Sequence, residues 1–480
     1  MKTRIMKNKI VFVGIIGMSL LLAGCNAPLL TQKSVNRNIP LSFSTTGDTL
    51  STEVVDWKSY FQDPFLNALI DTALSNNQEL NITLQEIEIA KNEISARKGE
   101  YLPFVGYKAG AGVEKVGRYT SQGANDANTE IKDGKETPEF LPDFVGGLYA
   151  SWELDIWHKL RNAQKAASMR YLATQEGKNF MVTNLIAEIA NSYYELRALD
   201  YQLEILESNI EIQSNALRVV KIQKQASKVT ELAVKRFEAQ VLNTQSMQFR
   251  VKQDIVEVEN RINFLLGRYP QPVLRNKTGF EQLSTDILQA GLPSQLIENR
   301  PDIRMAENEL AANKLDVEVA KANFYPSLGL SGVIGLQSFN PVYLANLPKS
   351  LLTSLAGDLI GPLVNKRAIT TMYLNANAKQ TQAIYQYEQT LLNAYLEVSN
   401  QLANVENLKQ TYDFKSKEVS ALNESVSISN SLFNSARADY LEVLLTQKEA
   451  LASKLELVET KMNQMHAKVN VYKALGGGWK

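Results

Sequence analysis

Long stretches without helix-breaking residues limit most strongly what this chain can fold into. From Leu363 to Leu475 there are 113 consecutive residues without a proline or a glycine. From Ile156 to Leu266 there is no proline, and Gly177 is the only glycine. Helices in compact domains average about 11–12 residues, whereas a helix of roughly 65 residues spans on the order of 100 Å. Each stretch therefore predicts a very long helix that reverses into a second one.

Apolar residues recur in both stretches at the spacing of helices that pack against one another. The separations alternate between three and four residues in two sets: Leu196, Leu199, Leu203, Leu206 and Ile210, and Leu391, Tyr395, Val398, Leu402 and Val405. This 3.5-residue period is typical of coiled coils. The long helices are therefore expected to supercoil around neighbours.

Four segments outside these helices alternate between apolar and small or polar residues. They cover about 105–113, 144–156, 328–336 and 351–363. A period of two predicts strands, and each is about long enough to cross a bilayer, which takes roughly 9–11 tilted residues. Beyond the first 25 residues no apolar run is long enough for a transmembrane helix. The small and polar side chains are expected to face a water-filled passage: Gly106, Gly110, Gly112, Ser327, Gly329 and Ser331.

The order of helix, strand pair and long helices occurs twice. Tyr101-Leu102-Pro103 opens the first strand pair, and Phe324-Tyr325-Pro326 opens the second. Residues 229–234 can be laid without gaps on residues 438–443. The sequence therefore predicts an internal duplication with a period of about 210–220 residues.

Four strands are too few to close a membrane barrel, because the smallest have about eight. An open sheet in lipid would leave backbone groups at its edges unpaired, at several kcal/mol each. Two copies would give a filled eight-stranded barrel, and three would give twelve strands with room for a lumen. Two readings without a pore remain open: a soluble four-stranded sheet capped by a coiled coil, and a lipid-anchored structural periplasmic coiled-coil tether.

The first residues have the layout of a secretory signal peptide. Four basic residues within residues 1–9 precede an apolar run from Ile10 to Leu22. Leu22-Ala23-Gly24-Cys25 resembles a bacterial lipobox, which predicts removal of residues 1–24 and lipidation of Cys25. Asn26, instead of an aspartate, favours the outer membrane. An ordinary signal peptide with a chance cysteine is the alternative.

Composition and charge exclude several functional classes. Cys25 is the only cysteine, so the chain has no internal disulfide. Without residues 1–24 the balance is 47 basic (51 minus 4) against 51 acidic residues, a net charge of −4, which does not suggest a nucleic-acid partner. A triad would need His158 or His466, and no catalytic motif surrounds either. No zinc-ligand pairing, phosphate loop or dinucleotide turn is present, so we expect no enzymatic activity, cofactor or metal.

Motifs along the whole chain resemble those of TolC-type outer-membrane factors, and most closely the OprM-like (NodT-type) efflux lipoproteins. The matching stretches are residues 57–66 (WKSYFQDPFL), 151–161 (SWELDIWHKLR), 264–270 (FLLGRYP), 292–294 (LPS), 300–304 (RPDIR), 320–328 (AKANFYPSL) and 474–479 (ALGGGW). The resemblance implies an α+β membrane protein: a trimer with a twelve-stranded outer-membrane β-barrel, four strands per chain, continuous with a twelve-helix periplasmic α-barrel. It also implies docking on a periplasmic adaptor (membrane fusion protein) coupled to an inner-membrane pump.

The resemblance and the patterns together imply a layout for the chain. After the signal peptide, the expected parts are the lipidated tether 25–56, a first-repeat helix 57–100, the first strand pair 101–157, long helices 158–266, an equatorial connection 267–301, a second-repeat helix 302–323, the second strand pair 324–365, long helices 366–475 and a tail 476–480. Within the first strand pair, about residues 118–142 form an unusually long polar loop, expected to face the exterior.

Candidate site residues follow from the two expected helix reversals. By resemblance the tips meet the adaptor: Ser227, Lys228, Val229 and Thr230, and Ala436, Arg437, Ala438 and Asp439. Glu442 matches a position where related channels carry an acidic ring that narrows the entrance. The second acidic position of that pattern is Leu445 here, so an acidic and a hydrophobic constriction both stay open, as does Glu442 as a solvated helix residue.

The function implied is the outer-membrane exit duct of a tripartite efflux system that passively conducts small molecules. A type I protein-secretion duct and a metal-efflux duct are the alternatives within this class. Since the pump largely chooses the cargo, the sequence does not name it.

Overall fold

The computed structural model describes residues 27–30, 33–43, 56–287, 293–435 and 437–479. The expected signal peptide, Cys25 and Ala436 lie outside these residues. Backbone contacts divide the chain into two compact units. The sheet unit contains residues 88–171 and 308–384, and the helix unit contains residues 35–87, 172–307 and 385–480.

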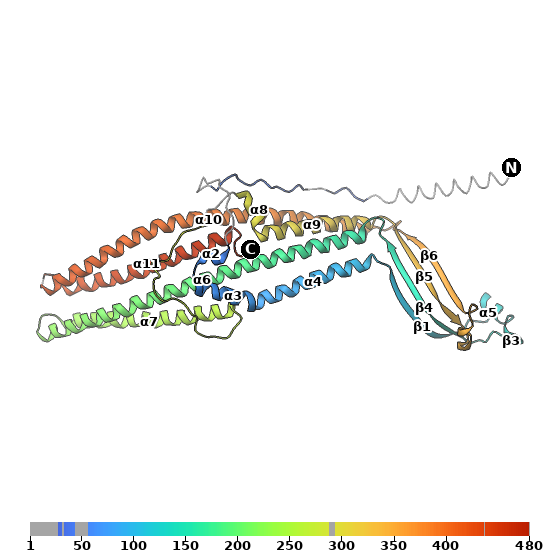
Figure 1. The fold of residues 1–480 in the computed structure, drawn as a ribbon, viewed down its shortest axis with the longest axis horizontal. Helices are drawn as coiled ribbons and strands as arrows, with labels where there is room; N and C mark the ends of the chain where they lie inside the picture. The colour runs from blue at the N-terminus through green and yellow to red at the C-terminus, as the bar shows by residue number, and fades with distance from the viewer. Residues whose placement is uncertain (1–26, 31–32, 44–55, 288–292, 436, 480) are drawn as a thin grey trace. The chain divides into compact units, whose positions relative to one another are not determined.

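Four strands in the sheet unit form one antiparallel sheet in the order β1-β4-β5-β6 (Figure 1). They are β1 (Phe104–Glu114), β4 (Leu141–Leu154), β5 (Ser327–Ser338) and β6 (Leu351–Ile360). Phe104 pairs with Ser151, and Ser327 pairs with Ile360. The structure thus confirms the four predicted strands, with β1 and β6 at the two edges of the sheet.

One face of this sheet exposes its apolar residues. Tyr107 on β1 is 85% exposed and Leu355 on β6 is 86% exposed, and Val105, Val113 and Leu359 lie on the same face. The opposite face carries Gly106, Gly110 and Ser331. A soluble antiparallel sheet buries its apolar face on a core, so an apolar face left exposed indicates that this face meets an apolar surrounding.

The long helices are present with the predicted lengths. They are α6 (Lys159–Gln225, 67 residues) and α10 (Arg367–Asn434, 68 residues), each followed by a 35-residue return helix, α7 (Glu231–Leu265) and α11 (Tyr440–Ala474). In the described part of the chain, no helix has the length and apolar character needed to cross a membrane.

The region expected as one helix, 57–100, contains three. They are α2 (Trp57–Phe61), α3 (Pro64–Asn76) and α4 (Gln78–Glu100). Gln62 adopts a left-handed conformation, φ 47°, which ends α2. The Asp63 carboxylate then accepts from Phe65 N, and Asn77 caps α4 by accepting from Leu80 N. These N-caps satisfy helix-end donors, and pattern spacing alone does not reveal them. The second-repeat helix is α9 (Pro301–Ala322), preceded by the short η1 (Pro293–Gln295) and α8 (Leu296–Asn299).

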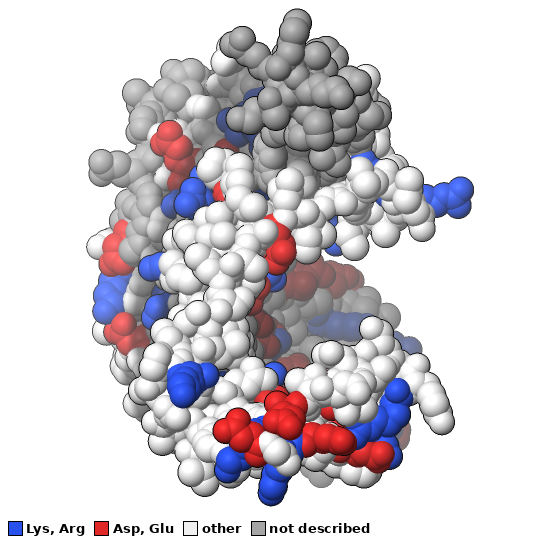
Figure 2. All heavy atoms as spheres, turned by 90° about the vertical axis from the view of Figure 1, so that its right-hand side faces the viewer, with Lys and Arg blue, Asp and Glu red and all other residues white. Residues whose placement is uncertain are grey.

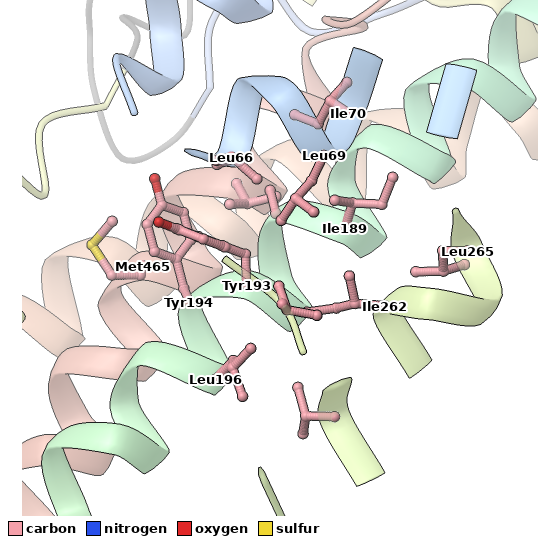
Figure 3. Close-up of a cluster of buried hydrophobic side chains, with 14 of the residues drawn as sticks. Leu66, Leu69, Ile70, Ile189, Tyr193, Tyr194, Leu196, Ile262, Leu265 and Met465 are labelled. Atoms are coloured by element: carbon pink, nitrogen blue, oxygen red, sulfur yellow. The ribbon is translucent and has the colours of Figure 1, made fainter. Parts of the chain in front are cut away.

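The main core of the helix unit joins α3, α6, α7 and α11 (Figure 3). Leu66 of α3, Tyr193 of α6 and Ile262 of α7 are fully buried in it. The predicted heptad residues Leu196, Leu199 and Leu206 belong to the same core, and Leu391, Val398 and Leu402 of α10 are also buried. The periodicity thus identified the packing face of both long helices.

The polar loop between β1 and β4 is folded. It contains α5 (Ser121–Asp126) and a hairpin of β2 (Glu130–Lys132) and β3 (Lys135–Glu136). Lys115 and Arg118 both lie near Glu139, at 3.0 and 3.8 Å. Acidic and basic side chains lie together at the lower edge of Figure 2, which looks onto the loop end of the sheet. The loop is therefore a small charged module rather than an irregular connection.

The two return helices end in the same way, which supports the predicted duplication. After α7, Gly267 N donates to Phe264 O and Arg268 N to Asn263 O; after α11, Gly476 N donates to Lys473 O and Gly477 N to Tyr472 O. Both are Schellman motifs. The Leu265 carbonyl accepts from Asn77 Nδ2 (2.9 Å), and the Ala474 carbonyl accepts from Arg300 Nη1 (2.8 Å). Corresponding residues are therefore 209 apart (474 minus 265) after the strand pairs and 223 apart (300 minus 77) before them.

Candidate functional site

The first helix reversal lies at the predicted residues. α6 ends at Gln225 and α7 begins at Glu231. Ser227 takes a left-handed conformation, φ 58°, and Lys228 N donates to Gln223 O at 2.9 Å. Thr230 caps α7 by accepting from Ala233 N, and Lys224 pairs with Glu231 at 2.6 Å across the turn. Val229 is half-buried, whereas Ser227 and Lys228 are exposed.

The second reversal is built alike. α10 ends at Asn434 and α11 begins at Tyr440. Arg437 N donates to Leu432 O at 2.9 Å, and the Asp439 carboxylate accepts from Tyr440 N at 2.7 Å. Arg437 and Asp439 are exposed, and Ala438 is half-buried. Both tips thus present charged side chains on a backbone fixed by caps.

The two tips pack against each other within the helix unit. Val220 of α6 and Val234 and Phe237 of α7 are buried in an apolar cluster with Phe433 of α10 and Tyr440 of α11. The sequence pattern does not predict this cluster, although Phe433 and Tyr440 flank the predicted reversal. The cluster holds the two helix tips of one chain together.

Glu442 and Leu445 lie on the exposed side of α11, just beyond this cluster. They are three residues apart, so they share one helix face, and Leu445 is 47% exposed. Glu442 N donates to Asp439 O in the first turn of the helix. The face therefore offers a carboxylate and, one turn further on, an isobutyl group.

Buried charged groups tie the connecting segment to the helices. Arg275 contacts Asp200 and Glu259, and all three side chains are mostly buried. Arg197 contacts Asp63 at 3.4 Å and donates to Thr278 O. Such pairs were not predicted, because their partners lie on helices and segments far apart in sequence.

Two lysines of α11 are buried beside this connecting segment. Lys461 Nζ donates to Leu283 O at 2.7 Å, and Lys468 Nζ donates to Ser284 O at 3.1 Å. Burial lowers the pKa of both ammonium groups. Lys468 lines a hollow of about 760 Å³ together with Tyr60, Tyr194 and Asp286. The carbonyl contacts suit a role in holding the connecting segment in place.

Aromatic residues mark the base of the sheet. Trp152 Nε1 donates to Tyr101 O at 2.9 Å, and Trp157 Nε1 donates to Pro326 O at 2.8 Å. Trp157 also stacks on Tyr325, with ring centroids 4.7 Å apart. Indoles that bury one side and bond through N–H suit a membrane–water boundary.

No catalytic or metal site takes shape around the histidines. His158 lies in the sheet unit, at the turn before α6, and His466 lies in the helix unit. His466 is half-buried, with Nε2 3.2 Å from the Asn191 carbonyl. Across the described ranges, no group of His, Cys, Asp and Glu residues is placed to hold a metal ion.

Substitution of His466 by asparagine is expected to flatten the pH dependence of stability. Burial lowers the pKa of His466 from its ordinary value of 6.5, against the raising effects of the Asn191 carbonyl and Glu195 and the further lowering effect of Arg261. Below about pH 6.5 the unfolded chain therefore binds more protons than the folded one, so stability falls as pH decreases. Thermal unfolding of both proteins at several pH values measures this. The control is His158→Asn, because asparagine tolerates the left-handed conformation of that residue. Identical pH profiles for the wild type and His466→Asn would contradict the prediction.

The chain is similar to known proteins over nearly its whole length. A family model described as "Outer membrane efflux protein" matches residues 69–268 and 292–477. The pyoverdine export outer membrane protein OpmQ of Pseudomonas aeruginosa is 26% identical over 469 residues, which cover 98% of this chain and 97% of OpmQ. The cation efflux system protein CusC of Escherichia coli is 25% identical over 469 residues, covering 96% and 98%. The open-state structure of the MtrE outer membrane channel of Neisseria gonorrhoeae has a TM-score of 0.81 at 22% identity, covering 95% of this chain and 99% of MtrE.

Proposed function

Because the chain belongs to the outer membrane efflux protein family, we propose that three copies of it form one exit duct, open to a periplasmic adaptor at the helix tips. The chain is an outer membrane efflux channel of the kind used by tripartite efflux pumps, and it is not an enzyme. Its task is passive conduction, since the pump supplies the energy.

The main support for a trimer is the four-stranded sheet with its exposed apolar face. Its edge strands β1 and β6 each leave one row of backbone groups without a strand partner among the described residues. In lipid these groups cost several kcal/mol each when unpaired. Three copies pair every edge and leave a lumen lined by the glycine- and serine-rich face. A periplasmic tether would not need this alternation.

The amino-terminal segment supports an anchor at the base of the sheet. Ala27 and Leu30 pack on Val317, Phe324 and Tyr373 of the sheet unit. In the helix unit, Arg37 pairs with Glu307 at 2.7 Å and Phe43 stacks on Tyr395. Residues of both described stretches, 27–30 and 33–43, thus pack on the protein. We assign the proposed lipid on Cys25 to the outer membrane.

The helix tips fit the proposed docking role. Exposed Lys228, Arg437 and Asp439 stand at the reversals, while the apolar cluster behind them is buried. An adaptor can therefore bind charged loops without competing for the core of the entrance. Nothing in the described charge distribution favours nucleic acid.

The proposed cargo class is small molecules, including toxic compounds. OpmQ is described as exporting pyoverdine and CusC as part of cation efflux, so similar ducts serve chemically different cargo. We assign the choice of cargo to the pump. Metal efflux remains within this class, whereas protein secretion finds no specific support in the described residues.

Conductance of the purified protein in planar lipid bilayers tests this function. We expect ion current that is restricted at the entrance, because Glu442 and Leu445 from three copies would face one axis. Leu445→Ser should raise the single-channel conductance several-fold by removing apolar groups that exclude water and ions. Leu242→Ser, a matched change at another exposed leucine (60% exposed) on α7, should not. A folded trimer that carries no current in any form would overturn the proposed function.

A further inference from the structure

The two edge strands of the sheet, β1 and β6, indicate how one copy of the chain would pair with the next. β1 begins directly after Pro103, and β5 begins directly after Pro326, again 223 residues later (326 minus 103). At their first residues, Phe104 pairs with Ser151 and Ser327 pairs with Ile360. Ser151 and Ile360 are 209 apart (360 minus 151), the same separation as between the ends of the return helices. β5 therefore repeats β1, and β6 repeats β4, residue by residue.

A seam here means the pairing of the last strand of one repeat with the first strand of the next. The seam within one chain therefore predicts the register of the seam between two chains. Inside the chain, the second strand of repeat one, β4, pairs with the first strand of repeat two, β5. Across copies, the second strand of repeat two, β6, meets the first strand of repeat one, β1, of the next copy. If the repeats are equivalent, both seams have the same register.

The register can be carried over by arithmetic. Tyr149 pairs with Val333 in the inner seam. Adding 209 to the first and subtracting 223 from the second gives Asp358 opposite Gly110. The pair Val145 and Gln337 gives, in the same way, Ser354 opposite Glu114. The pair Leu154 and Leu328 gives Leu363 opposite Val105.

Two independent features agree with this register. On the apolar face, this register places Leu359 beside Ala109 and Leu355 beside Val113, so that all four side chains would face lipid. On the pore face it places Asp358, the only charged residue of β6, one diagonal step from Lys108, the only basic residue of β1. Both are exposed within one copy.

We propose that β6 pairs with β1 of the next copy with Asp358 opposite Gly110, so that Asp358 and the next copy's Lys108 form an ion pair across the seam. Diagonal neighbours lie about 7–8 Å apart between Cα atoms, within reach of a lysine side chain. Gly110 has no side chain in the space between them. A slip of two residues that makes Gly112 the partner of Asp358 moves Lys108 out of reach. A slip of two residues in the other direction would place Lys108 directly opposite Asp358, so the ion pair excludes only the slip toward Gly112. The equivalence of the two repeats excludes the other slip. This inference rests on the trimeric duct proposed above.

Engineered cysteines test the register directly. Because Cys25 is the only natural cysteine and is expected to carry lipid, the two engineered cysteines would supply the only free thiols. Ser354→Cys with Glu114→Cys joins residues that are directly opposite in the proposed seam, and it keeps both Lys108 and Asp358. Ser354→Cys with Gly112→Cys and Ala356→Cys with Glu114→Cys are the matched controls, each displaced by two residues. After mild oxidation of the full-length protein in membranes, only the first pair should give a covalent trimer on a non-reducing denaturing gel.

Charge exchange tests the ion pair. Lys108→Glu and Asp358→Lys should each lower the temperature at which the trimer dissociates in detergent, and the double variant Lys108→Glu/Asp358→Lys should recover most of the loss. Recovery distinguishes an ion pair from a general folding defect of either single variant.

The outcomes separate this inference from the proposed function. A native mass equal to one copy would refute the trimeric duct itself. A trimer that cross-links through a control pair, through no pair, or without recovery in the double variant would refute the proposed seam and leave the duct standing.

Discussion

Replacing Arg300 by methionine is expected to lower the free energy of unfolding by about 3–5 kcal/mol, the range for removing one member of a buried ion pair. The Arg300 side chain is 7% exposed, and it contacts Asp302 and Glu397 at 2.8 and 2.7 Å. Burial alone would lower the pKa of this guanidinium, but hydrogen bonds and charges from the two carboxylates hold it above its usual value. Methionine would leave both carboxylates and the Ala474 carbonyl without this donor.

Chemical unfolding in detergent, followed by circular dichroism, measures the loss. Arg97→Met is the matched control, because Arg97 lies on the exposed side of α4 and pairs with Glu93 and Glu100 in solvent. Exposed pairs of this kind contribute about 0.2–1 kcal/mol. If Arg300→Met destabilises the protein no more than Arg97→Met does, the structural role assigned to Arg300 is wrong.

Replacing Gly267 by alanine is expected to destabilise the protein by about 2–4 kcal/mol. Gly267 has φ +66°, and a Cβ atom there would lie 2.4 Å from the Asn76 carbonyl oxygen. The left-handed conformation costs a residue with a side chain about 1–2 kcal/mol. The contact with rigid backbone adds to this, because neither the turn nor the end of α3 can shift without breaking the Asn77 cap.

The same measurement with Gly476→Ala should give a similar loss, since a Cβ atom there would lie 2.5 Å from the Asn299 carbonyl oxygen. Gly99→Ala is the control: Gly99 lies in α4 with open space around its Cβ position. It should be neutral or stabilising by up to about 1 kcal/mol, because alanine favours a helix more than glycine does. Equal effects at positions 99 and 267 would show that the turn geometry does not matter.

The long helices and the strands were predictable because their signals are local. A run of 113 residues without proline or glycine leaves few alternatives to helix, and strict alternation fixes a strand and its two faces. The reversal at Ser227 to Thr230 followed from length and from the repeat. Its capping by Thr230 uses a residue type that favours helix starts.

Other features depend on contacts between distant segments. Asp63 and Asn77 read as ordinary polar residues in a helical stretch, yet their side chains cap the starts of α3 and α4. Arg275 meets Asp200 and Glu259 only after the connecting segment has wrapped against α6 and α7. Phe433 and Phe237 join in one cluster although about 200 residues separate them in the chain. No pattern within a short window of sequence contains these pairs.

The unequal helix lengths have a mechanical consequence. α6 has 67 residues, whereas α7 and α4 beside it have 35 and 23 and meet end to end where Asn77 bonds the Leu265 carbonyl. Met181 of α6 contacts Thr83 of α4 at 3.1 Å, and Tyr193 and Ile262 lie in the same core on the other side of this joint. The unbroken helix α6 therefore spans the junction between α7 and α4. We expect an axial load to be carried by α6, and sideways bending to begin at this junction.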